Sequence, residues 1–221
     1  MIVTKNLVAV KTTVSDKEAY QNALLNIPFN EILLEMKEYA SLNDVPIMQD
    51  EGIAFLITIL KIKKPKKILE IGSAIGYSSS FMALNSDSTI DTVERDLKMI
   101  EECKKNHLRL GLNERINLIE CDALEVLDII KDRKYDLIFI DAAKAQYIKF
   151  FEMFSPLLSE GGVIISDNLY FHDLLFTDVC NRDLRQLVRK VDKYNKFLLE
   201  NKDFETHIFK IGDGIGVSTR L

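Results

Sequence analysis

The spacing of apolar residues changes at Pro65, which divides the chain into two parts. Before Pro65, apolar residues recur at helical intervals, and polar residues suited to helix capping precede them. Asp16 can cap a helix over residues 17–26, and Asn30 can cap a second helix with the sequence EILLEMKEYASL. A third helix, EGIAFLITILKI, is expected from about Asp50. The first part of the chain is therefore predicted to be helical.

After Pro65, short apolar runs of strand length alternate with stretches of helical periodicity. Seven strands are expected, and they read KILEIG, TIDTVE, INLIEC, YDLIFID, GGVIISDN, ETHIFKI and GIGVSTRL. The helices expected between them cover about residues 77–85, 97–110, 124–130, 144–158 and 182–201. This alternation predicts an α/β fold with a doubly wound, mostly parallel seven-stranded sheet. The last two strands are joined too tightly for a crossover helix, so we expect them to run antiparallel to each other.

Length and composition fit one globular domain. We expect a single domain over residues 1–221, with a helical part over residues 1–64 and a core over residues 65–221. No apolar run approaches the ~20 residues of a membrane span, and the N-terminus has no secretory signal pattern, so we expect a cytoplasmic protein without a membrane partner. A net charge of −5 does not favour a bulk polyanion binder, although local patches can override the total. Three cysteines form no metal-binding pattern and are predicted to lie in or near the core: Cys103, Cys121 and Cys180.

A glycine-containing turn follows the first strand and reads Glu70-Ile-Gly72-Ser-Ala-Ile-Gly76-Tyr-Ser78. Glycine lets the backbone turn sharply and approach a ligand closely, and the free N–H groups of the next helix can bind that ligand. The spacing differs from the GxGxxG of dinucleotide enzymes. Glu70 would repel a pyrophosphate but could accept a hydrogen bond from an ammonium group. The turn therefore disfavours a nicotinamide dehydrogenase and indicates a cofactor with an amino acid end.

Carboxylates also end the next two strands. Glu94 in TVERD can accept hydrogen bonds from both ribose hydroxyls. Asp122 in ECDALE can accept from an adenine amino group, and the N–H of Ala123 can meet a ring nitrogen. Each carboxylate alone could be a helix cap. Three such features at the ends of successive strands predict a nucleoside cofactor.

Candidate metal ligands follow the fourth and fifth strands. Asp141 ends the fourth strand in the sequence DAAK, which also contains Lys144, and Asp167-Asn168 ends the fifth. Neighbouring parallel strands would bring the three oxygen ligands together, and two carboxylates with one amide oxygen suit a hard cation such as Mg²⁺. Asp-Asn is also common in turns, and Asp141 could cap the next helix. Together, beside a cofactor turn, these residues predict a metal site.

The order of these features from Lys67 to Leu221 resembles the class I methyltransferases, whose cofactor is S-adenosylmethionine. More narrowly, the chain resembles the catechol and caffeoyl-CoA O-methyltransferases in MQDEG, LEIGSAIGYSS, VERD, CDAL, FIDAAK, SDN and GDGIGV. The resemblance implies a Rossmann-like methyltransferase fold in which residues 65–221 bind S-adenosylmethionine. It implies cofactor contacts at Met48, Glu70, Gly72, Ser78, Glu94, Asp122, Ala123 and Asp141.

The same resemblance implies a divalent cation, such as Mg²⁺, held by Asp141, Asp167 and Asn168, with Lys144 near the acceptor hydroxyl. Asp141 and Lys144 are then the catalytic candidates. A cation favours the ionised form of a hydroxyl bound to it, and Lys144 could take the proton. We also expect a homodimer. The N-terminal helices could cover the acceptor pocket or form a dimer contact, and the sequence leaves both open.

The methyl acceptor is suggested by departures from the family pattern. The family often reads Asp-Ala-Asp-Lys followed by Asn-Tyr, whereas this chain has DAAK followed by Gln146-Tyr147 and contains no tryptophan. It resembles the bacterial branch that methylates 5-hydroxyuridine in tRNA to 5-methoxyuridine. Five cations on one helix face could contact phosphates, or could simply be solvated: Arg182, Arg185, Arg189, Lys193 and Lys196. The alternative is a small catechol-like or caffeoyl-type phenolic acceptor.

Other residues have plainer interpretations. His107 is predicted to lie on a helix surface, and His172 could line the acceptor pocket. Four aromatic residues at helical spacing are predicted to be core: Tyr147, Phe150, Phe151 and Phe154. An RNA-binding module on an inactive methyltransferase fold is a further alternative, which the retained candidate ligands disfavour.

Overall fold

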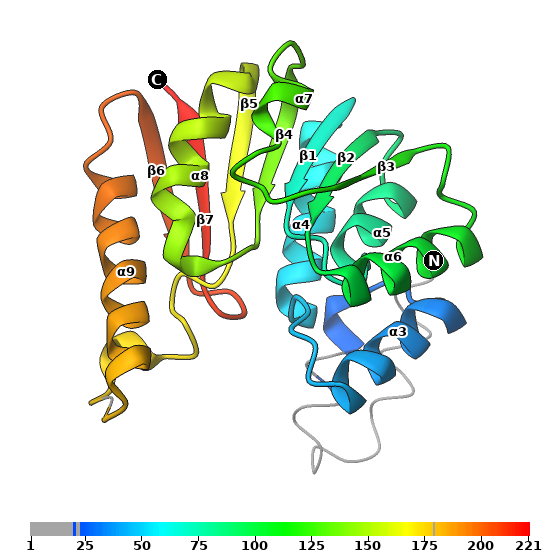
Figure 1. Ribbon diagram of the computed structural model, residues 1–221, viewed down its shortest axis with the longest axis horizontal. Helices are drawn as coiled ribbons and strands as arrows, with labels where there is room; N and C mark the ends of the chain where they lie inside the picture. Colours follow the sequence, from blue (N-terminus) through cyan, green and yellow to red (C-terminus); the bar gives the residue numbers. More distant parts are fainter. Residues whose placement is uncertain (1–19, 21–22, 179) are drawn as a thin grey trace.

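The computed structural model describes Tyr20, residues 23–178 and residues 180–221. Its centre is a seven-stranded sheet with the order β3-β2-β1-β4-β5-β7-β6 (Figure 1). The strands are β1 (Lys67–Ile71), β2 (Thr89–Glu94), β3 (Ile116–Glu120), β4 (Tyr135–Ile140), β5 (Leu158–Ser166), β6 (Phe204–Phe209) and β7 (Ile215–Arg220). Neighbours among β1 to β5 pair in parallel, and β7 is antiparallel to both β5 and β6. The predicted fold class, with its antiparallel last strand, is confirmed.

Helices cover both faces of this sheet. They are α3 (Glu31–Leu42), α4 (Asp50–Lys63), α5 (Tyr77–Leu84), α6 (Leu97–Arg109), α7 (Leu127–Ile130), α8 (Tyr147–Phe154) and α9 (Arg182–Leu199), with short 3-10 helices η2 (Lys144–Gln146), η3 (Ser155–Leu157) and η4 (Leu174–Phe176). Successive side chains of a strand point to opposite faces, so Ile68 packs with α3, α4 and α5 while Leu69 packs with α8 and α9. Figure 1 shows α9 along the β6 edge and α3 to α6 gathered towards the opposite edge.

The helices before Pro65 belong to the same core as the sheet. The side chain of Asn30 accepts a hydrogen bond from Leu33 N at 2.9 Å, as expected of an N-cap. Leu33 of α3 and Leu56 of α4 are fully buried in one cluster with Phe81 of α5. Half of the helix predicted over residues 17–26 lies outside the described residues, and within the described half Tyr20 and residues 23–25 are helical.

Two predicted helices are shorter than expected. The helix expected over residues 124–130 is reduced to α7, which starts at Leu127. The helix expected over residues 144–158 is divided into η2, α8 and η3, and its last residue already belongs to β5. Pro156 lies in η3 and lacks the N–H that would continue an α-helix. No helix in the described part of the chain is long and apolar enough to cross a bilayer.

The strand register aligns the carboxyl ends of the central strands. Ile71 of β1 pairs with both Val93 and Ile140, and Ile140 pairs with Ser166 of β5. The residues that follow these positions therefore leave the sheet side by side, since adjacent strands are about 4.8 Å apart. Most of the candidate site residues lie at or next to this edge.

Candidate functional site

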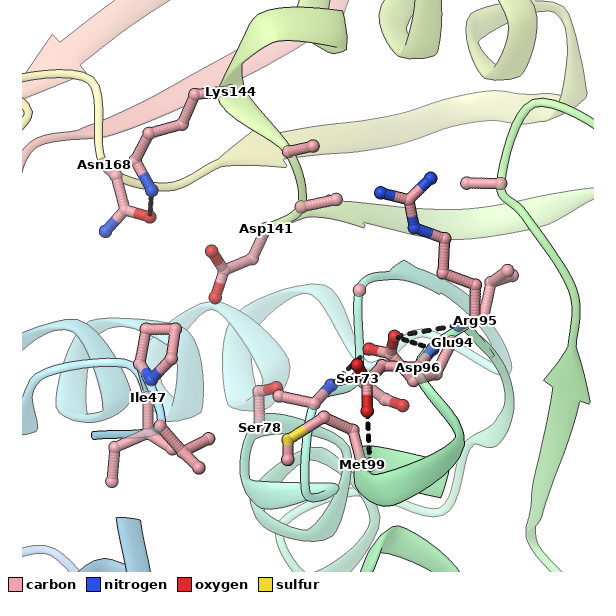
Figure 2. Close-up of a pocket in the computed structure, with 18 of the residues that line it drawn as sticks. Ile47, Ser73, Ser78, Glu94, Arg95, Asp96, Met99, Asp141, Lys144 and Asn168 are labelled. Atoms are coloured by element: carbon pink, nitrogen blue, oxygen red, sulfur yellow. Dashed lines mark hydrogen bonds between the residues drawn. The ribbon is translucent and has the colours of Figure 1, made fainter. Parts of the chain in front are cut away.

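A cleft of about 1060 Å³ opens at the carboxyl edge of the sheet. Turns after β1 to β5 and the segment before α4 form its walls. Of the predicted site residues, those that line it are Met48, Gly72, Ser78, Glu94, Asp122, Ala123, Asp141, Lys144 and Asn168. Figure 2 shows Asp141 between the Lys144–Asn168 pair and the Glu94–Arg95 turn. The structure thus brings together in one cleft side chains that are up to 120 positions apart in sequence (Met48 to Asn168).

Glu70 and Asp167 are not among the residues that line the cleft. Glu70 is fully buried beneath the glycine turn, where its carboxylate accepts hydrogen bonds from Ser78 Oγ at 2.5 Å and from Thr92 Oγ1. Burial raises the pKa of the Glu70 carboxyl to about 7. Ser78 does line the cleft, so Glu70 can act on a ligand through the Ser78 hydroxyl.

Glu94 organises the turn at the end of β2. Its Oε2 accepts from Ala74 N at 2.9 Å, while its Oε1 accepts from Arg95 N at 2.8 Å and Asp96 N at 2.9 Å. Arg95 also lines the cleft, and its Nη1 lies 2.6 Å from Asp122 Oδ2. The N–H of Leu124 and the Arg95 guanidinium lower the pKa of the Asp122 carboxyl. Arg95 was not predicted as a site residue, although it follows Glu94 directly in VERD.

The glycines of the first turn are required by packing. A Cβ on Gly72 would lie 2.2 Å from Asp141 O, so only glycine lets the turns after β1 and β4 meet. A Cβ on Gly76 would lie 2.6 Å from His107 Nε2 and 2.9 Å from Cys103 Sγ. Both glycines have positive φ, 91° and 81°. Close packing between segments of this chain therefore explains why both positions are glycine, and no ligand is needed to explain them.

The prediction that His107 lies on a helix surface is wrong. Only 3% of the residue is exposed, and its Nε2 lies 3.1 Å from Ser79 Oγ. Burial lowers the pKa of the His107 imidazole to about 4. Cys103, one helical turn earlier, is also buried, and its Sγ lies 3.7 Å from Ser73 Oγ. These two side chains of α6 support the glycine turn from below.

Asp141, Asp167 and Asn168 follow neighbouring strands, as expected. Asp141 N donates to Ile71 O at 3.0 Å, and Asp167 N donates to Ile140 O at 3.1 Å, so the two aspartates stand next to each other at the sheet edge. Burial raises the pKa of both carboxyls, and the charge of Asp141 raises that of Asp167 further. Lys144 Nζ donates to Asn168 Oδ1 at 2.8 Å. Among the described residues, no group of three or more His, Cys, Asp or Glu side chains is arranged to hold a metal ion.

The remaining predictions have mixed outcomes. The four aromatic residues predicted as core are all buried: Tyr147, Phe150, Phe151 and Phe154. The basic residues predicted on one face of α9 are all exposed: Arg182, Arg185, Arg189, Lys193 and Lys196. Cys103 is buried as expected, but Cys180 is exposed, which is contrary to the prediction. His172 lines the cleft.

Asp213 is a second residue that was not predicted from the sequence. It is 6% exposed, and its Oδ1 accepts a hydrogen bond from His172 N, while its Oδ2 lies 3.4 Å from His172 Nδ1. Its position in the terminal GDGIGV was a signal, but nothing in the sequence indicated that this turn contacts the segment that carries His172.

Comparisons with known proteins show the family and the fold of this chain. The family model described as O-methyltransferase matches residues 21–221. A flavonoid 3',5'-methyltransferase from Vitis vinifera is 32% identical over 205 residues, which cover 86% of this chain and 84% of that protein. A Staphylococcus aureus structure, provisionally named a caffeoyl-CoA O-methyltransferase, is 36% identical with a TM-score of 0.88 and covers 93% of this chain and 99% of its own. The O-methyltransferase from Bacillus cereus, solved in complex with SAH, is 26% identical with a TM-score of 0.76 and covers 88% of this chain and 93% of its own.

Proposed function

Because the chain belongs to the O-methyltransferase family, we propose that it methylates a hydroxyl of a small phenolic acceptor held on a divalent cation, with S-adenosylmethionine as methyl donor. The observation that carries this proposal is the position of Asp141, Lys144 and Asn168 on the wall of one cleft with the glycine turn, with Asp167 directly behind Asn168. A methyl donor and a hydroxyl on a cation could meet there.

S-adenosylmethionine fits the half of the cleft between Gly72 and Ala123. Its amino acid end would lie at the Gly72–Ser78 turn, its ribose at Glu94, and its adenine at Asp122 and Ala123. The Tyr77 hydroxyl supports this fit, because it is buried, belongs to a residue that lines the cleft, and has no hydrogen-bond partner among the described residues. A buried hydroxyl without a partner is unfavourable, and a polar ligand would relieve it.

The donor set also fits a hard divalent cation. Two carboxylates and an amide oxygen are the ligands that Mg²⁺ prefers, and the raised pKa values of Asp141 and Asp167 reflect charges that burial and mutual repulsion disfavour. When bound, the cation would supply the positive charge that favours the ionised form of an acceptor hydroxyl. Met48 and Phe150 also line this cleft and give it apolar surface.

Lys144 is the base in this proposal. Its ammonium group already sits on Asn168 Oδ1, the amide oxygen that we assign to the cation. As a neutral amine, Lys144 would take the proton of the acceptor hydroxyl. The oxygen would then attack the methyl carbon as the carbon–sulfur bond breaks, and the cleft would contribute the alignment of the two reactants.

A small phenol with adjacent hydroxyls is the acceptor we favour. The relatives described above are named for flavonoid and caffeoyl-CoA substrates. A 5-hydroxyuridine in tRNA is the second candidate, because it presents adjacent hydroxyl and carbonyl oxygens and because five of the exposed cations of α9 are spaced to share one face. The net charge of −5 counts against a polyanion.

Labelled-methyl transfer from S-adenosylmethionine tests the proposal. Catechol, caffeate and tRNA lacking 5-methoxyuridine are compared as acceptors, each with Mg²⁺ and with a chelator. We expect Mg²⁺-dependent labelling of the phenols and loss of turnover in Asp141→Ala, with an unchanged far-UV circular dichroism spectrum as proof of folding. Asp128→Asn, at a side chain that is 92% exposed, is the control. Labelling of tRNA without labelling of the phenols would show that tRNA is the acceptor. Full activity in the presence of the chelator would show that no cation is needed.

A further inference from the structure

The segment after Asn168 has an unusual backbone. Phe171, His172 and Asp173 are consecutive residues with φ of 49°, 54° and 58°, and Asn168 has φ of 60°. Side chains make this left-handed region unfavourable for residues other than glycine. Such conformations persist only where surrounding contacts impose them, and they concentrate at functional sites.

The turn between β6 and β7 imposes this conformation. Leu169 N donates to Gly214 O at 2.9 Å, and Tyr170 N donates to Asp213 O at 2.8 Å. Asp213 Oδ1 accepts from His172 N, inside the left-handed stretch. A Cβ on Gly214 would lie 2.8 Å from Tyr170 N, so the two segments meet without room for a side chain. Asp213 therefore holds the segment that carries His172.

The second carboxylate oxygen of Asp213 has no hydrogen-bond partner among the described residues, although it is buried. His172 Nδ1 lies 3.4 Å from it, slightly beyond a good hydrogen bond. The His172 side chain is 65% exposed and lines the cleft beside Lys144 and Asn168. A small rotation of this exposed ring would direct Nδ1–H to Asp213, which leaves Nε2 as the free nitrogen.

We propose that His172, oriented by Asp213, binds a hydroxyl of the acceptor ring outside the pair held at the cation. With Nδ1–H turned to the carboxylate, Nε2 accepts a hydrogen bond from that third hydroxyl. His172 then determines selectivity among phenolic acceptors, and Asp213 is a positioning residue. Lys144 Nζ lies 5.7 Å from the centroid of the Phe171 ring, so the residue before His172 adjoins the proposed base. The inference rests on the proposed function and adds a preference for trihydroxylated rings.

Steady-state kinetics with pyrogallol and catechol, which differ by one hydroxyl, test this inference. We expect the wild type to have a higher kcat/KM for pyrogallol. His172→Gly suits the positive φ and removes the imidazole. It should lower kcat/KM for pyrogallol about tenfold, mainly through KM, and change that for catechol less than about twofold. Asp213→Asn keeps an oxygen for His172 N but replaces Oδ2 by a donor, so it should lower the same ratio. His172→Gln should have a pyrogallol to catechol ratio between those of His172→Gly and the wild type.

His207 provides the matched control, since its Nε2 lies 3.4 Å from Glu205 Oε1 on β6, and it is not among the residues that line the cleft. His207→Ala should leave both acceptors unaffected. S-adenosylhomocysteine affinity, measured by calorimetry, should be unchanged in every variant. An unchanged pyrogallol to catechol ratio in His172→Gly, or equal losses for both phenols, would overturn the inference alone. Failure of the wild type to methylate either phenol would overturn the proposed function and the inference with it.

Discussion

Replacing Glu70 by glutamine should stabilise the cofactor-free protein at pH 8 and weaken its binding of S-adenosylmethionine. Burial is the main reason that the pKa of this carboxyl rises to about 7, from an ordinary value of 4.5. Between those two values the folded protein binds more protons than the unfolded chain. The free energy of unfolding therefore falls as pH rises through this window, and it stays lower above pH 7.

The size of the effect follows from the same pKa values. Each pKa unit is worth about 1.36 kcal/mol, so the gap between 4.5 and about 7 amounts to about 3 kcal/mol at pH 8. Glutamine carries no charge, and its amide can accept from one of the two hydroxyls and donate to the other, Ser78 Oγ or Thr92 Oγ1. We expect E70Q to gain about 2 kcal/mol at pH 8 and almost nothing near pH 4.5.

Urea unfolding at both pH values measures the change, with Glu114→Gln at an exposed position as the control. Titration with S-adenosylhomocysteine at pH 8 measures the cofactor site, where we expect about tenfold weaker binding because the charge behind Ser78 is lost. A variant that is less stable than wild type at both pH values would refute the reasoning about burial. Unchanged cofactor affinity would show that Glu70 has no influence on the cleft.

Three further predictions follow from the geometry. Stabilisation of the fold by Mg²⁺ should grow as pH rises from 6 to 8, because the raised pKa values of Asp141 and Asp167 mean that protons must leave before a cation binds. Asp167→Asn should abolish this stabilisation. A shift in Tm with Mg²⁺ that does not depend on pH would contradict the assigned ligands. Gly76→Ala should destabilise by about 2 to 4 kcal/mol, because a Cβ would meet His107 and Cys103 at a positive φ, whereas Gly111→Ala has a positive φ with nothing within 4 Å and should cost about 1 kcal/mol. Equal losses of unfolding free energy in these two variants would rule out the contact. Arg185→Glu with Arg189→Glu should leave methylation of phenols unchanged, and a steep salt-dependent loss of tRNA binding in the same variant would favour the tRNA acceptor.

The sequence alone determined the order of the elements. The period of apolar residues changes at Pro65, and strand-length runs then alternate with helices, so the parallel sheet and its antiparallel end follow from local pattern. The N-cap at Asn30 was equally predictable from the sequence, because capping involves residues three positions apart. Carboxyl ends of parallel strands share one edge of a sheet, so the positions of Glu94, Asp122 and Asp141 near one cleft were predictable as well.

Only the tertiary structure decided which side chains face the cleft and which support it. Glu70 lies one residue before the end of β1, whereas Glu94 is the last residue of β2, and Glu70 is buried beneath Ser78. His107 looked like a surface residue, because the turn that covers it lies 31 positions earlier at Gly76. Asp213 reaches His172 across 41 positions, through a turn whose sequence indicates only a tight reversal. A local pattern gives the direction of a side chain relative to its own helix or strand, whereas burial and partners depend on segments that meet only after the chain has folded.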